Sequence, residues 1–161
     1  MCCKISTIKK SPARKFARAL KKEDIVGDYI RDLQNYYMIL NHIEDSLVIK
    51  EYRSDGKGNF IGGEIICASK VKADHYGLSI RKILGKTDFD LMQPEQAKKA
   101  LEDDLWVMQN KKPIENINET ITYPGGRTVK KSTTKSPVFY ESGEIRGVIC
   151  ISRYIEIVSE K

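Results

Sequence analysis

The sequence predicts an α+β protein, with a five-stranded antiparallel sheet and its helices on one face of that sheet. One observation is the order of hydrophobic periods, which is helical over 23–43, strand-like over 46–53 and 60–68, helical over 94–111, and strand-like again from 114 to 157. The other is that short turns rich in Gly, Pro, Asn and Ser separate neighbouring strand candidates, as in antiparallel hairpins. Helices packed on one face of such a sheet bury both kinds of apolar surface economically.

Basic side chains are concentrated at the N-terminal end of the chain. Of the 28 Lys and Arg residues, eight lie within residues 1–22, which hold no acidic residue, whereas the remainder carries all 22 Asp and Glu residues and is close to neutral. We expect residues 1–22 to be a solvated basic leader, with contact to an acidic membrane or to nucleic acid as the alternative. A uniformly basic nucleic-acid-binding surface is excluded. No apolar run is long enough to span a bilayer and no signal-peptide core is present, so we expect a cytoplasmic location.

Residues 23–43 have the period of an amphipathic helix with a heptad-like apolar seam. The seam consists of Val26, Tyr29, Leu33, Tyr36, Leu40 and Ile43. Two interpretations remain open, because the helix can pack on its own domain or pair with its copy in a homodimer. The tyrosines favour an interface that is partly hydrated.

A hairpin and a short helix follow this segment. The strand candidates 46–53 and 60–68 flank a turn, and Gly62-Gly63 in the second strand predicts a bulge or close packing. Ser69 is placed to cap a short helix, and Gly77 is placed to end it.

The stretch 85–113 predicts a capped turn and then a long helix. Thr87 or Asp88 can cap the turn, while Pro94 is a natural first helical residue and Pro113 a natural stop. The apolar stripe of this helix consists of Ala97, Leu101, Leu105 and Met108. Trp106 lies beside the stripe, so we expect it to be at least partly exposed and to contribute to a contact surface.

We assign structural and not catalytic or metal-binding roles to the acidic run of the long helix, the two internal cysteines and the histidines. The run Glu102-Asp103-Asp104 is interpreted as a solvated helix face and not as a paired-carboxylate site. Cys67 and Cys150 are interpreted as small buried apolar residues. The two histidines lie far from any cysteine pair, so no metal site is predicted.

Three strand candidates, at 114–123, 127–140 and 144–157, complete the predicted sheet. The segment 147–152 is almost wholly apolar, which predicts that the last strand is central.

Four segments in the right order resemble the PAS sensor-domain family, over about residues 40–156. The segment SLVIKEYRSDGKGNFIGGEIICASK resembles the first two strands, and KADHYGLS followed by ILGKTDFDLM resembles the turn into the small helices. The segment DDLWVMQNKKPIEN resembles the end of the long helix, and TTKSPVFYESGEIRGVICISRYIE the last hairpin. Two positions depart from the family pattern. Ser69 stands where an asparagine is often found, and Tyr154 stands where an acidic residue couples the core to the output.

The charge pattern, the helical period and the resemblance together divide the chain into four parts. These are the basic leader 1–22, the amphipathic helix 23–43 as a candidate dimerisation element, a PAS domain at 44–157 and, at 158–161, the start of a linker to a candidate output domain.

The resemblance also implies a cup between the sheet and the small helices, in which many family members bind a small molecule. Haem-binding members place an axial histidine on the long helix, and residues 94–111 contain none. Flavin photosensors require a cysteine near the small helices, and residues 83–92 contain none. The sequence thus argues against haem and photoactive flavin and identifies no cofactor, so an unknown small molecule remains the candidate ligand.

The wall of the cup is predicted to be apolar with a few polar groups. The candidate pocket residues are Tyr76, Phe89, Leu101, Leu105, Met108, Ile117, Glu119, Ser132, Thr134, Ile149 and Ile151. The polar contacts of Glu119, Ser132 and Thr134 depend on strand parity, because successive residues of a strand face opposite sides. The alternative is that the apolar members simply fill the core. His75 has no identifiable catalytic partner, and we predict no enzyme activity.

The leading functional hypothesis is a sensory or regulatory PAS module that senses a small ligand or partner and relays the change through flanking helices. A sensor kinase of a two-component system, a cyclic-dinucleotide enzyme or a transcriptional regulator would be the rest of the polypeptide, beyond residue 161. We expect a homodimer. Its interface candidates are Val26, Tyr29, Leu33, Tyr36, Leu40 and Trp106. The alternative is a ligand-free homodimerisation or protein-interaction module.

Overall fold

The structure is a computed structural model that describes residues 22–159, with side chains from residue 31 onward. The chain divides into two compact units, Met1–Met38 and Ile39–Lys161. The predicted leader therefore lies outside the described residues, except for Lys22 at the start of the first helix, and so do the side chains of Val26 and Tyr29.

The first described element is helix α2 (Lys22–His42), close to the predicted bounds. Two seam residues are substantially exposed, Leu33 at 42% and Tyr36 at 43%, whereas Leu40 near the end of the helix is buried. No helix within the described part of the chain is both long and apolar enough to cross a membrane.

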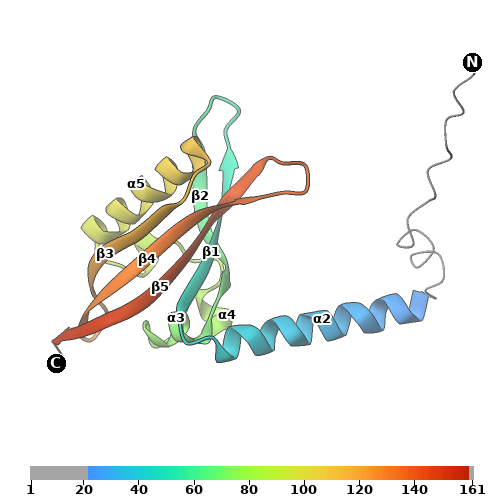
Figure 1. Ribbon diagram of the computed structural model, residues 1–161, viewed down its shortest axis with the longest axis horizontal. Helices are drawn as coiled ribbons and strands as arrows, with labels where there is room; N and C mark the ends of the chain where they lie inside the picture. The colour runs from blue at the N-terminus through green and yellow to red at the C-terminus, as the bar shows by residue number, and fades with distance from the viewer. Residues whose placement is uncertain (1–21, 160–161) are drawn as a thin grey trace, which may run out of the picture. The chain divides into compact units, whose positions relative to one another are not determined.

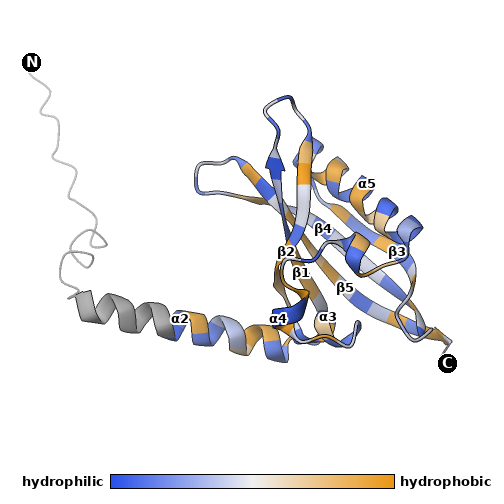
Figure 2. Ribbon diagram, turned by 180° about the vertical axis from the view of Figure 1, so that it is seen from behind, coloured by the Kyte–Doolittle hydropathy of each residue, from blue (hydrophilic) through white to orange (hydrophobic). Residues whose placement is uncertain are grey.

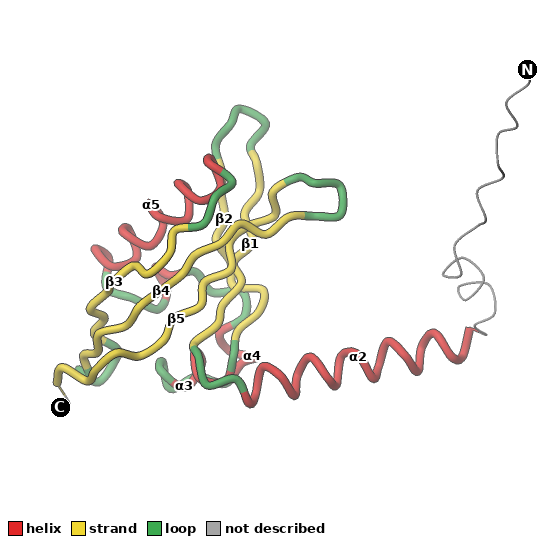
Figure 3. The backbone as a smooth tube through the Cα atoms, in the orientation of Figure 1, coloured by secondary structure: helices red, strands yellow, loops and turns green. Residues whose placement is uncertain are grey.

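Five antiparallel strands form one sheet, as the sequence predicts (Figures 1 and 3). They are β1 (Ser46–Ser54), β2 (Phe60–Ala68), β3 (Ile114–Thr122), β4 (Thr128–Phe139) and β5 (Ile145–Ser159). Their order is β2-β1-β5-β4-β3, so the apolar last strand is central, as expected. Strand β5 continues to Ser159 and so includes residues 158 and 159, which the sequence assigned to a linker.

The helices between β2 and β3 cover one face of the sheet (Figures 1 and 2). They are α3 (Lys70–Asp74), α4 (Ile80–Ile83), the 3₁₀ turn η1 (Asp88–Asp90) and α5 (Pro94–Asn110). Ser69 caps α3, because its hydroxyl accepts a hydrogen bond from the backbone N–H of Lys72. Thr87 and Asp90 share the capping of η1, which leaves the side chain of Asp88 directed elsewhere.

The strands present alternating residues to the helices, and both hydrophobic and hydrophilic residues occur along them in Figure 2. Two apolar clusters are buried. The larger contains Ile65, Ile83, Val107, Met108 and Val148, and the smaller contains Ile121, Tyr123 and Val129. Charged side chains are buried as well, including four lysines, so the core is not a continuous apolar layer.

Strands β1 and β5 approach each other very closely at Gly147. A Cβ atom added there would lie 1.9 Å from the carbonyl oxygen of Lys50. Because the obstacle is backbone and not a flexible side-chain end, only glycine fits this position. The close approach fixes the strand whose inward side chains include Lys50 and Tyr52.

Candidate functional site

A buried ionic cluster joins the sheet to the helices. Asp104 of α5 is fully buried and forms ion pairs with Lys50 of β1 and Lys135 of β4, the latter at 2.9 Å. The hydroxyl of Tyr52 donates a hydrogen bond of 2.8 Å to the same carboxylate. Lys50 also pairs with Asp88 of η1 at 2.6 Å. Four elements, β1, η1, α5 and β4, are therefore linked through Asp104 and Lys50.

Electrostatics favour the charged forms within this cluster. Burial by itself would lower the pKa of Lys50, but its anionic neighbours outweigh burial and hold that pKa well above its usual value. Cys150 is near Lys50, but burial raises the pKa of its thiol to about 11, so it is neutral near pH 7 and the carboxylates provide the stabilisation. Burial would likewise raise the pKa of Asp88, yet Lys50 and Lys72 lower it to about 2. Asp88 is thus an anion at neutral pH.

A second group of buried polar residues has an excess of positive charge. The Lys131 ammonium lies 3.4 Å from the Glu119 carboxylate and donates a hydrogen bond of 3.3 Å to the Ser152 hydroxyl. Glu119 also accepts a hydrogen bond from Thr133. Lys72 of α3 is 7% exposed, and among the described residues no carboxylate lies within ion-pair distance of it. Its Nζ atom lies 5.2 Å from the centroid of the Tyr76 ring.

Burial lowers the pKa of both Lys72 and Lys131. For Lys131 the Glu119 charge opposes this effect, whereas Lys72 adds to it. The two ammonium groups are therefore the least compensated charges of the interior.

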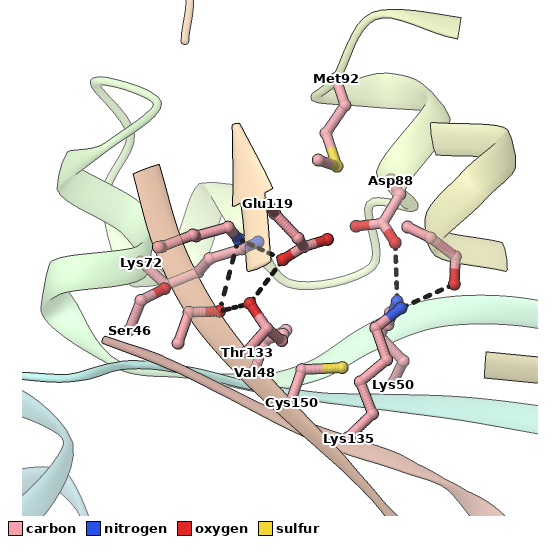
Figure 4. A pocket seen from close by; sticks show the side chains of 13 residues that line it. Ser46, Val48, Lys50, Lys72, Asp88, Met92, Glu119, Thr133, Lys135 and Cys150 are labelled. Atoms are coloured by element: carbon pink, nitrogen blue, oxygen red, sulfur yellow. Dashed lines mark hydrogen bonds and ion pairs between the residues drawn. The ribbon is translucent and has the colours of Figure 1, made fainter. Parts of the chain in front are cut away.

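A cavity of about 30 Å³ lies between these two groups (Figure 4). A space of this size holds about two water molecules. The residues lining it are Ser46, Val48, Lys50, Lys72, Asp88, Met92, Ala100, Glu119, Lys131, Thr133, Lys135, Cys150 and Ser152. Four of them are lysines, and the cavity is polar where an apolar wall was expected.

Of the predicted pocket residues, only Glu119 lines this cavity. Ile117 joins Glu119 in a separate groove of about 270 Å³ between α5 and β3. Met108 is buried in the larger apolar cluster, and three other predicted residues are partly buried against that cluster. These three are Tyr76, Leu101 and Leu105. Phe89 is 56% exposed, because it lies on the outer side of η1 while its neighbour Asp88 is buried.

The assumed strand parity is wrong for β4 and β5. Ser132 and Thr134 alternate with the buried residues Lys131, Thr133 and Lys135, so they face away from the helices. Ile149 and Ile151 likewise alternate with Val148, Cys150 and Ser152, which are buried. The inner positions of β4 are occupied by Lys131, Thr133 and Lys135, whose polar groups pair with Glu119, Ser152 and Asp104.

The interpretation of Glu102-Asp103-Asp104 as a solvated face is also wrong. Only Glu102 is exposed, while Asp103 and Asp104 are buried. A signal for Asp104 existed, since it lies three and four residues from Leu101, Ala100 and Met108 and therefore on the helix face that packs inward. Trp106 is 45% exposed, in agreement with the expectation. Cys67 and Cys150 are buried free thiols, also as expected.

A small aromatic cluster lies at the end of β5. The Tyr154 hydroxyl and the His75 Nε2 atom share a hydrogen bond, and the His75 ring lies 4.8 Å from the Tyr123 ring, centroid to centroid. Burial, together with the nearby lysines, lowers the pKa of His75 to about 4. His75 is therefore neutral near pH 7. Within the described residues, no group of three or more His, Cys, Asp or Glu side chains is arranged to hold a metal ion.

Comparison with known proteins identifies the fold. A family model described as the PAS fold matches residues 62–159. Among similar solved structures, VqmA of Vibrio cholerae has a TM-score of 0.63 at 18% identity, covering 76% of this chain and 52% of that one. A PAS domain of Colwellia psychrerythraea has a TM-score of 0.59 at 17% identity, covering 76% and 96%. The PAS domain of an HTR-like protein of Haloarcula marismortui has a TM-score of 0.59 at 13% identity, covering 83% and 100%. The chain spans about half the length of VqmA, and no curated protein matches it at a significant level.

Proposed function

Because the chain belongs to the PAS family, we propose that it is the sensory or regulatory module of a signal-transduction protein and that a small polar molecule occupies its lysine-lined cavity. The observation that carries the proposal is the set of four buried lysines around one cavity in the cup. Ligand sites are concave and contain a few convergent polar groups, and groups with perturbed pKa values collect at such sites.

A contribution to folding stability alone does not explain why four lysines are buried around the cavity. Replacement of a buried ion pair by well-packed apolar residues is often neutral or stabilising, so buried charges are weak evidence of a stabilising role. Lys72 lacks even the ion pair that would offset its desolvation. A cavity that holds an uncompensated cation is better explained by a ligand that completes it.

The cavity is connected to the segments that would relay a signal. Ser46 lines it and lies four residues after His42, the last residue of α2. On its other side, Ser46 pairs in register with Ser152 of β5, which also lines the cavity. A change at these two serines reaches both the helix that enters the domain and the strand that leaves it.

The type of output domain is proposed from the neighbours. VqmA is described as a LuxR-type receptor that binds target DNA and has been solved with DPO bound. Since this chain spans about half of VqmA, a transcriptional regulator is the output that we favour over a sensor kinase or a cyclic-dinucleotide enzyme.

Hydrogen exchange tests the proposal. The protein is incubated with the low-molecular-weight fraction of a cell extract, and amide exchange is compared with that of untreated protein. We expect slower exchange in β1 and β4 and altered exchange in α2. The protection should disappear in Lys131→Met and persist in Lys130→Met, since Lys130 is the exposed neighbour on the same strand. No protection with any fraction, or equal protection in both variants, would contradict the proposal.

A ligand-free dimerisation module is the second candidate. Two observations favour it, namely the small volume of the cavity and the apolar exposure of α2, where Leu33, Met38 and Ile39 are each at least 42% exposed. Light scattering on a chain that lacks residues 23–43 tests this candidate. An unchanged oligomeric state would exclude α2 as the dimerisation element.

A further inference from the structure

We propose that the ligand of this cavity is a small monocarboxylate, whose anionic group binds between the ammonium groups of Lys72 and Lys131. The inference rests on the proposed sensory function and specifies the chemistry of its ligand. It follows from the charge, the hydrogen-bond donors and the volume at one end of the cavity.

The charges of the cavity separate into a compensated half and an uncompensated half. Lys50 and Lys135 are matched by the carboxylates of Asp88 and Asp104. In the other half, the carboxylate of Glu119 pairs with Lys131. Lys72 has no ion pair of its own among the described residues and is attracted only from a greater distance by Asp88, which is paired with Lys50. Asp103 lies outside the lining of the cavity and divides its carboxylate between the outer residue Lys99 and Lys135, whose Nζ atom is 3.7 Å away. Among the described residues, the Lys72–Lys131 half of the cavity therefore holds one more ammonium group than carboxylates.

The same half of the cavity offers hydrogen-bond donors that suit a carboxylate. The ammonium groups of Lys72 and Lys131 and the hydroxyls of Ser46 and Ser152 all come from residues that line it (Figure 4). Ser152 is already linked to Lys131 and Thr133. An anion placed among these groups receives charge-assisted hydrogen bonds. Its negative charge also offsets the loss of hydration that burial imposes on the two ammonium groups.

The net charge and the volume restrict the choice of anion. A monoanion balances the excess charge of the Lys72–Lys131 half, whereas a dianion such as sulfate would leave a buried negative charge beside Glu119. A cationic ligand would be repelled by the ammonium group of Lys72, which has no ion-pair partner among the described residues. About 30 Å³ admits the carboxylate end of a molecule such as formate or acetate. Two surface grooves share lining residues with the cavity, the α5–β3 groove through Glu119 and a second groove through Glu119 and Lys131.

Calorimetric titration with sodium acetate, in a buffer free of other carboxylates, tests the inference. Acetamide is the matched neutral ligand, because it has the shape of acetate without the charge. For a ligand of this size we expect saturable acetate binding, with a Kd between about 0.05 and 5 mM. Acetamide and sulfate should each bind at least about tenfold more weakly. Equal binding of acetate and acetamide, or no saturable acetate binding, would overturn the inference.

Lys72→Met and Lys70→Met form a matched pair of variants. Both residues lie on α3, but Lys70 is exposed and pairs with Asp74. We expect Lys72→Met to weaken acetate binding at least about tenfold and Lys70→Met to leave it unchanged. If Lys72→Met does not fold, Ser46→Ala replaces it, with an expected loss of about threefold to tenfold.

Unchanged acetate affinity in both Lys72→Met and Ser46→Ala would place the anion elsewhere and refute the inference. The proposed sensory function is contradicted by a different result from the one that contradicts the carboxylate assignment. If cell-extract fractions protect the cavity strands while acetate does not bind, the module still senses a ligand and only the carboxylate assignment is wrong.

Discussion

Asp104→Asn is expected to be among the most destabilising single changes in this domain. The substitution preserves the size and shape of the side chain but removes its charge. The carboxylate is fully buried, pairs with Lys50 and Lys135, and accepts a hydrogen bond from Tyr52. Without it, Lys50 retains Asp88, whereas Lys135 retains only the Ala100 carbonyl at 2.8 Å and a carboxylate 3.7 Å away.

The magnitude follows from the burial of both partners. Removal of one member of a buried ion pair costs about 3–5 kcal/mol, because it leaves an uncompensated charge out of water. For a domain of this size, each kcal/mol lowers Tm by about 3–5 °C. We therefore expect Tm to fall by roughly 10–20 °C.

Urea denaturation followed by circular dichroism measures the loss, with Glu102→Gln as the control two residues away on the exposed side of α5. The control should change the free energy of unfolding by less than about 0.5 kcal/mol. A loss below about 1 kcal/mol for Asp104→Asn, the range of exposed ion pairs, would refute the view that Asp104 holds the buried lysines.

Three further predictions concern other parts of the chain. Gly147→Ala should destabilise the protein by about 3 kcal/mol in the same urea assay, because the new Cβ atom would collide with the backbone of β1. A loss of less than about 1 kcal/mol would show that β1 and β5 can move apart to accommodate it. His75 has a folded-state pKa of about 4, whereas its ordinary value is 6.5. As the pH falls, the unfolded chain therefore binds a proton at His75 before the folded protein does, and the free energy of unfolding should decline between pH 6.5 and pH 4. That decline should be shallower in His75→Gln, and identical slopes would contradict the assignment. If α2 mediates dimerisation, Leu33→Lys should weaken the dimer at least about tenfold in light scattering while Asp32→Lys does not, and equal effects would exclude the seam.

Element order and boundaries were predictable because the signals are local. Ser69 before α3, Pro94 at the start of α5 and the Gly-containing turns act within a few residues of their own positions. The apolar run of β5 likewise predicted the central strand correctly, although helices cover only one face of the sheet and Ile151 on the other face is 38% exposed.

The site was less predictable because its geometry is tertiary. Lys131, Thr133 and Lys135 recur at period two. This spacing places them on one face of the strand, but it does not show whether that face points toward the helices or toward solvent. Hydrophobic ranking places lysine outward, and the ion pairs that reverse this choice involve residues on other elements, namely Glu119 for Lys131 and Asp104 for Lys135. The pattern of alternation was thus visible in the sequence, whereas the buried charge was not.

The most direct test of the lysine-lined cavity as an anion site is NMR of the lysine side-chain ammonium groups during an acetate titration. We predict saturable shifts and slower hydrogen exchange for Lys72 and Lys131, with no change at the exposed Lys70 and Lys130. Small, linear and equal shifts at all four ammonium groups would show that acetate acts only as bulk salt, and would contradict the account.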